Sequence, residues 1–415
     1  MSAMSTRLRY LLSASVCWVV VPFAVLFETI NLLDRNRPWR DDFLWATDWA
    51  GTSVFLVVPF LAGLVAADTS ILMSAHRRDL TLSTPRTGMS LLRPAVLAGG
   101  ACLVVHLLFL VPYAMEAQPM ARNLLPALYV VLAQLSVLMF FALFGAFLGA
   151  VLPLPWGPLL AAVSAPALMW LLGRNSGLFS PFDVGGSTSS LLGLALSPRF
   201  ALAQTVWLVL ALGVTVALLL WRWPWSGGTR FRVVNTAPFL LLFLVVLALQ
   251  QGPQMDRLEV VASPPQRECT GSSPVICVYP EHRRFARMVR VNVERIYAGV
   301  PPDVADALPR RIVERYPGGT PPRTAGVSAI EVLPDSFSSD KISMSATAID
   351  LVTPWRCPQI FASEAPPERY FRAADLLSKE LAAAGKGGTA LKDPARVQEF
   401  LGLLERVMSC QILRS

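Results

Sequence analysis

Lysine is absent from the chain before Lys341, and the whole chain contains only 3 histidines. All the lysines lie in the last quarter of the sequence, whereas the long uncharged apolar runs all lie before Gln251. Charged residues make up 15% of the chain and hydrophobic residues 54%, which is unlike the composition of a soluble globular protein. This division predicts a membrane domain over residues 1–251 and a water-exposed domain over residues 252–415.

Motifs for metal binding and nucleotide binding are also absent from the sequence. His76, His106 and His282 fall in a predicted loop, a predicted span and the tail, so they cannot share a metal, and none belongs to an HExxH motif. Gly385-Lys386 lacks both the earlier glycine and the following Ser/Thr of a phosphate-binding loop. We therefore expect no enzyme activity, no cofactor and no ATP hydrolysis by this chain alone.

The net charge of +8 raises the question of nucleic-acid binding. The arginines are scattered between apolar runs and along amphipathic segments, however, and do not form one basic patch. Arginines in such positions usually flank membrane spans and fix their orientation. Membrane lipids are therefore the expected partner, and nucleic acid is not.

The apolar part predicts about seven membrane spans, because a bilayer core of about 30 Å needs about 20 apolar residues as a helix. The predicted spans are residues 10–30, 49–67, 94–115, 124–152, 156–173, 203–221 and 233–249. The first stretch also follows arginines, as a signal peptide does, but it is longer than a typical signal core and lacks a small-residue cleavage site after it. Residues 174–200 are rich in Gly and Ser and predict an external loop, with a short interfacial helix at 190–196.

The distribution of arginine between the loops predicts the orientation of the chain. With a cytoplasmic N-terminus, the cytoplasmic segments carry more arginines than the short external loops do. An odd number of spans then places the C-terminal tail outside the cytoplasm. We expect a multi-pass protein of the plasma membrane.

The 6 cysteines divide between the same two parts of the chain. Some lie inside apolar spans, and the others lie in the tail: Cys269, Cys277, Cys357 and Cys410. An even number of cysteines in an extracytoplasmic segment is typical of disulfides. We expect the pairs Cys269 with Cys277 and Cys357 with Cys410, although these cysteines allow three connectivities and the sequence alone does not choose among them.

The tail has the periodicity of a small α+β domain. Amphipathic helices are predicted near residues 281–297 and 303–316, a break at 317–322, and strands at 327–333 and 342–352. Two further helices close the chain, with Pro367 and Pro394 in their first turns and Asp393 as an N-cap. The whole chain is therefore expected to be mostly α, a polytopic helical bundle followed by an α+β domain.

Two features inside the spans have both a functional and a packing interpretation. Gly145 and Gly149 form a GxxxG pair, which lets a second helix approach closely. His106 lies in the middle of a span, where an ionisable group is often functional, but a neutral imidazole bonded to a neighbouring helix costs little. We favour packing for His106, and likewise for Gln134 on the fourth span.

The segment between the second and third spans reads A-D-T-S-I-L-M-S-A-H-R-R-D-L-T-L-S-T-P-R over residues 67–86. The order of the elements and this loop resemble the permease subunits of ABC-2-type exporters, particularly permease-like membrane proteins of actinobacteria. The stretch C-T-G-S-S-P-V-I-C-V-Y-P-E-H-R-R, residues 269–284, is similar to the start of the extracytoplasmic domain that some of these proteins carry. The ordinary alternative for the loop is a solvated basic segment.

This resemblance implies a coupling helix that contacts a separate cytoplasmic ATPase. The residues that it would place at the contact are Asp68, His76, Arg77, Arg78, Asp79 and Arg86. The expected function is that of a permease subunit of an ABC-type transporter, working with the ATPase and with a second transmembrane subunit. The alternative is a membrane-anchored sensor or assembly protein whose tail binds a ligand or partner. Neither interpretation identifies a substrate.

Overall fold

The computed structural model describes residues 17–73, 87–117, 121–173, 179–220, 244–245, 248, 255–261, 266–316, 324, 326–354, 357 and 368–411. The chain divides into two compact units. The first unit comprises Met1–Asp34, Asp42–Leu191 and Ala195–Glu259, and the second comprises Arg35–Asp41, Leu192–Leu194 and Val260–Ser415.

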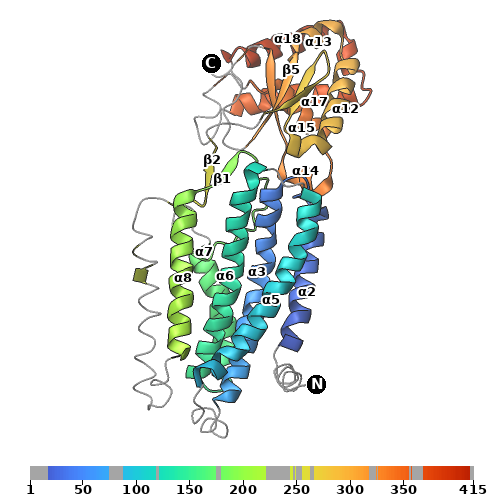
Figure 1. Ribbon diagram of the computed structural model, residues 1–415. Helices are drawn as coiled ribbons and strands as arrows, with labels where there is room; N and C mark the ends of the chain where they lie inside the picture. Colours follow the sequence, from blue (N-terminus) through green and yellow to red (C-terminus); the bar gives the residue numbers. More distant parts are fainter. Residues whose placement is uncertain are drawn as a thin grey trace. The chain divides into compact units, whose positions relative to one another are not determined.

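The first unit is a bundle of apolar helices (Figure 1). Its helices are α2 (Cys17–Leu33), α3 (Phe43–Leu72), α5 (Thr87–Ala117), α6 (Ala121–Val151), α7 (Trp156–Gly173) and α8 (Pro198–Leu220). A short 3-10 helix, η1 (Asp34–Asn36), follows α2. Helix α3 is the centre of the bundle, because it packs against α2, α5, α6 and α7.

Four of these helices are long and apolar enough to cross a membrane: Phe43–Leu72, Met89–Ala117, Leu124–Val151 and Pro198–Leu220. Helix α8 shows the consequence for packing. Trp207 and Ala211 are buried, yet Val206 and Val209 on its other side are more than half exposed. A helix that is apolar on both its buried and its exposed sides suits a lipid environment and not water.

The predicted spans agree with these helices in position but not at their ends. The span predicted at residues 156–173 coincides with α7, whereas α3 extends beyond both ends of the predicted 49–67. The first span begins before the described residues, and the seventh, at 233–249, lies almost wholly outside them. The number of seven spans therefore stays a prediction.

The short interfacial helix predicted at residues 190–196 is wrong. Strand β1 (Leu194–Leu196) lies there and pairs with β2 (Leu258–Val260) in a two-stranded sheet. Gly193, with φ of +78°, directly precedes β1 and has a conformation that favours glycine and interrupts a helix.

The second unit contains a sheet of four strands in the order β3-β4-β5-β6. The strands are β3 (Glu268–Thr270), β4 (Val275–Val278), β5 (Arg311–Arg315) and β6 (Val327–Glu331). Strands β3 and β4 are antiparallel, while β4, β5 and β6 are parallel. The helical elements around the sheet are η2 (Pro280–His282), α12 (Arg283–Gly299), α13 (Pro302–Ala307), α14 (Pro334–Ser339), α15 (Met344–Val352), α17 (Glu368–Gly385), η3 (Ala390–Lys392) and α18 (Pro394–Met408).

The last helix of the tail forms as the sequence indicates. The Asp393 carboxylate accepts a hydrogen bond from the Ala395 N–H, and Pro394 follows it in the first turn. Val397, Phe400 and the other buried side chains of α18 lie on one face of the helix and join the core of the second unit. The tail therefore has a hydrophobic core of its own.

Two predicted elements of the tail are wrong. The helix predicted at residues 303–316 ends at Ala307, and the rest is β5, whose Ile312 lies between Ile276 of β4 and Ser328 of β6. Its β-branched residues fit a strand with neighbours on both sides. The strand predicted at 342–352 is instead α15, because the Ser343 hydroxyl caps the helix by accepting from the Ala346 N–H at 2.9 Å.

Candidate functional site

Polar side chains are buried between the apolar helices of the first unit. The His106 Nδ1 atom of α5 lies 2.6 Å from Glu28 Oε1 of α2, and its Nε2 atom lies 3.1 Å from Gln134 Oε1 of α6. All three side chains are almost completely buried. Burying ionisable side chains between apolar helices costs free energy. Such side chains occur there mainly where they are paired with each other and where they serve a function.

The hydrogen bonds fix the position of one proton in this group. Gln134 Nε2 donates to two carbonyl oxygens, of Thr47 at 2.8 Å and of Val184 at 3.0 Å. Gln134 Oε1 must therefore accept from His106, which places a proton on His106 Nε2. A single further proton is then shared between His106 Nδ1 and Glu28 Oε1. In either position of that proton the pair carries no net charge, which is why it can stay buried.

Gln134 also joins the helices to the segment before α8. Its amide binds Val184 of that segment and Thr47 of α3. Gly51 of α3 permits the approach, because a Cβ atom there would overlap the carbonyl group of Val184. The side chain of Gln204 in α8 holds the same segment by donating to the carbonyls of Pro181 and Asp183. This loop is therefore bound to the bundle by buried amides.

A second buried group lies at the same loop. Arg257 Nη2 lies 2.5 Å from Asp48 Oδ1, and Arg257 Nε lies 3.6 Å from Asp183 Oδ1. The other oxygen of Asp48 accepts from the Ser187 N–H at 2.8 Å. Burial raises the pKa of the Asp183 carboxyl, and the Arg257 guanidinium opposes that rise. One arginine thus serves two carboxylates.

Two consecutive glycines make this arrangement possible. Gly185 and Gly186 have φ of +105° and +95°, and a Cβ on either would lie within 3.0 Å of α3 atoms of Asp48 or Thr52. Without side chains, the loop lies directly on α3, where the Gly186 N–H donates to the Asp48 carbonyl at 2.7 Å. The conformation and the close contact together exclude any larger residue.

The sequence alone indicates only part of this network. His106 and Gln134 were both noted and assigned to packing, while Glu28 was missed because it lies at the end of a long apolar run. Asp48 directly precedes the span predicted at residues 49–67, Asp183 lies in the predicted external loop, and Arg257 lies at the start of the predicted tail, so their positions in the sequence do not bring them together. The sequence signal that could have indicated these residues is the scarcity of charge in the apolar part of the chain. Each ionisable residue within an apolar stretch needs a partner.

The predicted ATPase contact lies mostly outside the described residues. His76, Arg77, Arg78, Asp79 and Arg86 all belong to that undescribed part, whereas Asp68 lies in the last turns of α3. Both glycines of the predicted GxxxG pair lie within the described residues. A Cβ at Gly145 would overlap the backbone of Ala62, and one at Gly149 would overlap that of Ala66, so both glycines of α6 lie directly against α3.

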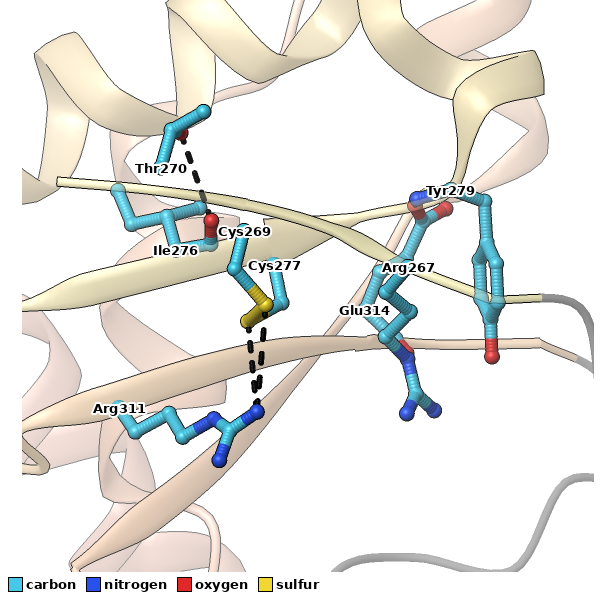
Figure 2. Close-up of a disulfide and its surroundings, with 8 residues drawn as sticks. All are labelled: Arg267, Cys269, Thr270, Ile276, Cys277, Tyr279, Arg311 and Glu314. Atoms are coloured by element: carbon cyan, nitrogen blue, oxygen red, sulfur yellow. Dashed lines mark hydrogen bonds between the residues drawn. A yellow bond between two sulfur atoms is a disulfide. The ribbon is translucent and has the colours of Figure 1, made fainter.

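The tail contains the two disulfides that were expected, Cys269 with Cys277 and Cys357 with Cys410. Cys269 and Cys277 face each other in the register of β3 and β4. Figure 2 shows the Arg311 side chain of β5 directed at this disulfide, with its Nη2 atom 3.9 Å and 3.8 Å from the two sulfurs. The first disulfide therefore ties the antiparallel edge strand to the sheet.

A polar group is also buried beside this sheet. The Glu314 carboxylate forms a hydrogen bond with His282 Nδ1 and accepts one from the Tyr279 N–H at 2.8 Å. Figure 2 shows Arg267 beside Tyr279, and its guanidinium lies 4.9 Å from the ring centroid. Burial raises the pKa of Tyr279 to about 12. This group fixes the turn from β4 into α12, and within the described residues no three His, Cys, Asp or Glu side chains are grouped to hold a metal ion.

Comparisons with protein-family models, with curated proteins and with solved structures find no match to this chain.

Proposed function

We propose that this chain is the membrane permease subunit of an ABC-type transporter in the plasma membrane. The buried network of Glu28, His106 and Gln134 is the observation that carries the proposal. An anchor needs only apolar helices, whereas this network connects α2, α5, α6 and the loop before α8 through ionisable and amide groups. Such groups within membrane segments are typical of substrate pathways and of helices that move.

The energy for transport would come from a cytoplasmic ATPase subunit, because the sequence contains no nucleotide-binding loop. The contact is proposed for the segment that follows Asp68 at the end of α3, with Arg77 and Arg78 as its basic centre. Helix α3 packs against most of the bundle, including α6 at Gly145 and Gly149. A force applied at that end of α3 would therefore reach the helices that hold the buried network. A second transmembrane subunit would complete the complex.

Charge reversal of Arg77 and Arg78 tests the ATPase contact. The full-length protein is purified from native membranes by an affinity tag, and co-purifying proteins are identified by mass spectrometry. We expect an ABC-type ATPase with the wild type and little or none with Arg77→Glu/Arg78→Glu. Arg310→Glu, on the exposed surface of the tail, is the matched control and should retain the ATPase. Retention of the ATPase by the double variant would contradict the proposed contact, and its absence from the wild type would contradict the function.

The second candidate is a membrane-anchored sensor or assembly protein. It is favoured by the independent core of the tail and by its two disulfides, which are typical of an extracytoplasmic binding domain. The same purification separates the two candidates. A sensor would co-purify with an extracytoplasmic partner after deletion of residues 74–86, whereas a permease would lose its ATPase.

A further inference from the structure

The first unit contains a partly open cavity of about 260 Å³ between α3, α7 and the loop that precedes α8. Its apolar wall is mostly aromatic and contains Phe55 of α3, Trp170 of α7 and Phe182 of the loop, beside Met169 and Val184. Its polar wall is formed by Thr52 and Asp183 with the backbone of the two glycines. A concave site with an apolar wall and few polar groups is the usual form of a ligand site.

Acidic side chains outnumber basic ones at the polar wall of the cavity. Asp48 and Asp183 share Arg257, which is their only cationic partner within the described part of the chain. Asp48 uses both carboxylate oxygens, on Arg257 and on the Ser187 N–H. Asp183 uses Oδ1 on Arg257 and on the Gly185 N–H, and its Oδ2 atom makes no hydrogen bond with any described residue. The group therefore contains two carboxyl groups and one guanidinium, and of the two carboxyl groups only that of Asp183 belongs to a residue that lines the cavity.

The aromatic wall is exposed on the side of the bundle that would meet lipid. Trp170 is 54% exposed and Phe55 is 37% exposed, and Val163 and Leu171 of α7 are also largely exposed. Aromatic faces attract cations, and the attraction grows when water is excluded. The cavity thus combines a carboxylate, aromatic faces and an opening among apolar side chains.

We propose that this cavity binds the cationic head of an amphiphilic organic cation, whose apolar part extends toward the lipid. The Asp183 carboxylate supplies the opposite charge, Trp170 and Phe55 contact the cation through their ring faces, and the glycine pair keeps the site free of side chains. An anion of the same shape is repelled by Asp183. This inference rests on the proposed transport function and names the class of substrate for it.

The test is direct binding of tritiated benzyltrimethylammonium to the full-length protein in lipid nanodiscs, measured by scintillation proximity. The wild type should bind it saturably, and benzylsulfonate, an anion of similar shape, should not compete. Asp183→Asn should weaken binding at least about 10-fold, because the charge is lost while the shape is kept. Trp170→Leu should weaken it about 3- to 10-fold, and Trp156→Leu, an exposed tryptophan on α7 outside the cavity, should leave it unchanged.

Asp183→Asn also alters a pair with Arg257, so its folding is checked by the shielding of the buried Cys102 from maleimide. If that variant does not fold, Trp170→Leu decides, because Trp170 is half exposed and lies outside the Asp48, Arg257 and Asp183 group. The absence of saturable binding, wild-type affinity in both cavity variants, or competition by benzylsulfonate as strong as that by unlabelled benzyltrimethylammonium would each overturn the proposal. No ATPase takes part in this measurement, so its failure is distinct from loss of the ATPase in the purification experiment.

Discussion

Glu28 and His106 show how an ionisable pair is kept between apolar helices without a net charge. The two side chains share one proton, and Gln134 Oε1 accepts a hydrogen bond from the other imidazole N–H. The pair therefore has no net charge, and both ring nitrogens of His106 have a hydrogen-bond partner. Replacing one partner removes this balance, because the remaining group is then buried without its hydrogen bond. The attraction within the pair therefore contributes little to the stability of the bundle. Removal of one partner is costly, because it leaves the other buried without a hydrogen bond.

His106→Leu should therefore destabilise the bundle by about 2 to 4 kcal/mol, since it leaves the Glu28 carboxyl buried without its partner. Glu28→Gln should cost only about 1 kcal/mol, because a glutamine N–H can still donate to His106 Nδ1. The measurement is the temperature at which the buried Cys102 becomes reactive to a maleimide dye, in a Cys17→Ser background. Equal losses in the two variants would contradict the shared proton.

Asp350 in the tail should make the stability of that unit depend on pH. Burial raises the pKa of Asp350 from 3.8 to about 8, so the folded state keeps a proton that the unfolded state loses. Stability should therefore fall as pH rises from about 4 to about 8 and level off above that. The expected loss between pH 6 and pH 8 is about 2 kcal/mol.

Resistance of the tail to a protease, measured on the full-length protein in detergent at both pH values, tests this expectation. Asp350→Asn should remove the pH dependence, because asparagine does not titrate. The hydrogen bond is kept, because the amide oxygen can accept from the Glu331 N–H as the carboxylate does. Asp306→Asn, on an exposed side chain, is the matched control and should behave as the wild type. Unchanged pH dependence in Asp350→Asn would contradict the assignment.

Residues of the network could be predicted from the sequence only in part. A histidine or a glutamine inside a span is visible, so His106 and Gln134 were found. Their partners come from other helices, and the sequence does not show that Glu28 and His106 lie close together in space. Arg257 could not be assigned at all, since its role depends on a loop that glycines bring onto α3.

At the scale of elements, the contact of α3 with α6 depends on two small residues. A methyl group at Gly145 or Gly149 would overlap the backbone of α3, so the helices could pack only after moving apart. Gly145→Ala and Gly149→Ala should each destabilise the bundle by about 1 to 3 kcal/mol. Gly213→Ala is the control on α8, where a Cβ meets nothing within 4 Å, and it should be neutral or slightly stabilising.

The same maleimide measurement on Cys102 serves for these glycine variants. If Gly145→Ala and Gly149→Ala reacted at the wild-type temperature, the close approach of α3 and α6 would be wrong. The GxxxG spacing alone predicted a close helix contact, but not that α3 is the partner.

The two disulfides of the tail close loops of different length. Their sequence separations are 53 for Cys357–Cys410 and 8 for Cys269–Cys277. Loop entropy alone gives about 4 kcal/mol for the longer and about 2.5 kcal/mol for the shorter. Cys357→Ser/Cys410→Ser should therefore lower protease resistance of the tail more than Cys269→Ser/Cys277→Ser does, and the reverse order would contradict the entropic account.

Elements were predictable where one local signal sufficed. The cap at Asp393 and the apolar face of α18 define that helix by themselves. Residues 342–352 alternate like a strand, yet the cap at Ser343 and packing against α17 make them helix α15. Residues 311–315 were predicted as part of a helix and form a strand instead, because the neighbouring strands β4 and β6 pair with them.

At the scale of the whole molecule, the chain consists of two parts that suit two solvents. The helices of the first unit expose apolar side chains, and the second unit has a hydrophobic core of its own. This division was evident from composition, since the long apolar runs stop before Gln251. The arginines of the loops predict the orientation of the chain in the membrane. The orientation decides whether the disulfides of the tail lie outside the cytoplasm, where disulfides persist.

The absence of lysine before Lys341 makes the orientation directly measurable. An impermeant amine-reactive biotin reagent is applied to intact cells and, separately, to lysed cells, and the labelled sites are mapped by mass spectrometry. Exposed Lys379 of α17 should be labelled equally in both samples, because the tail is expected outside the cytoplasm. Labelling of Lys379 only after lysis would place the tail inside and contradict the membrane arrangement proposed for this protein.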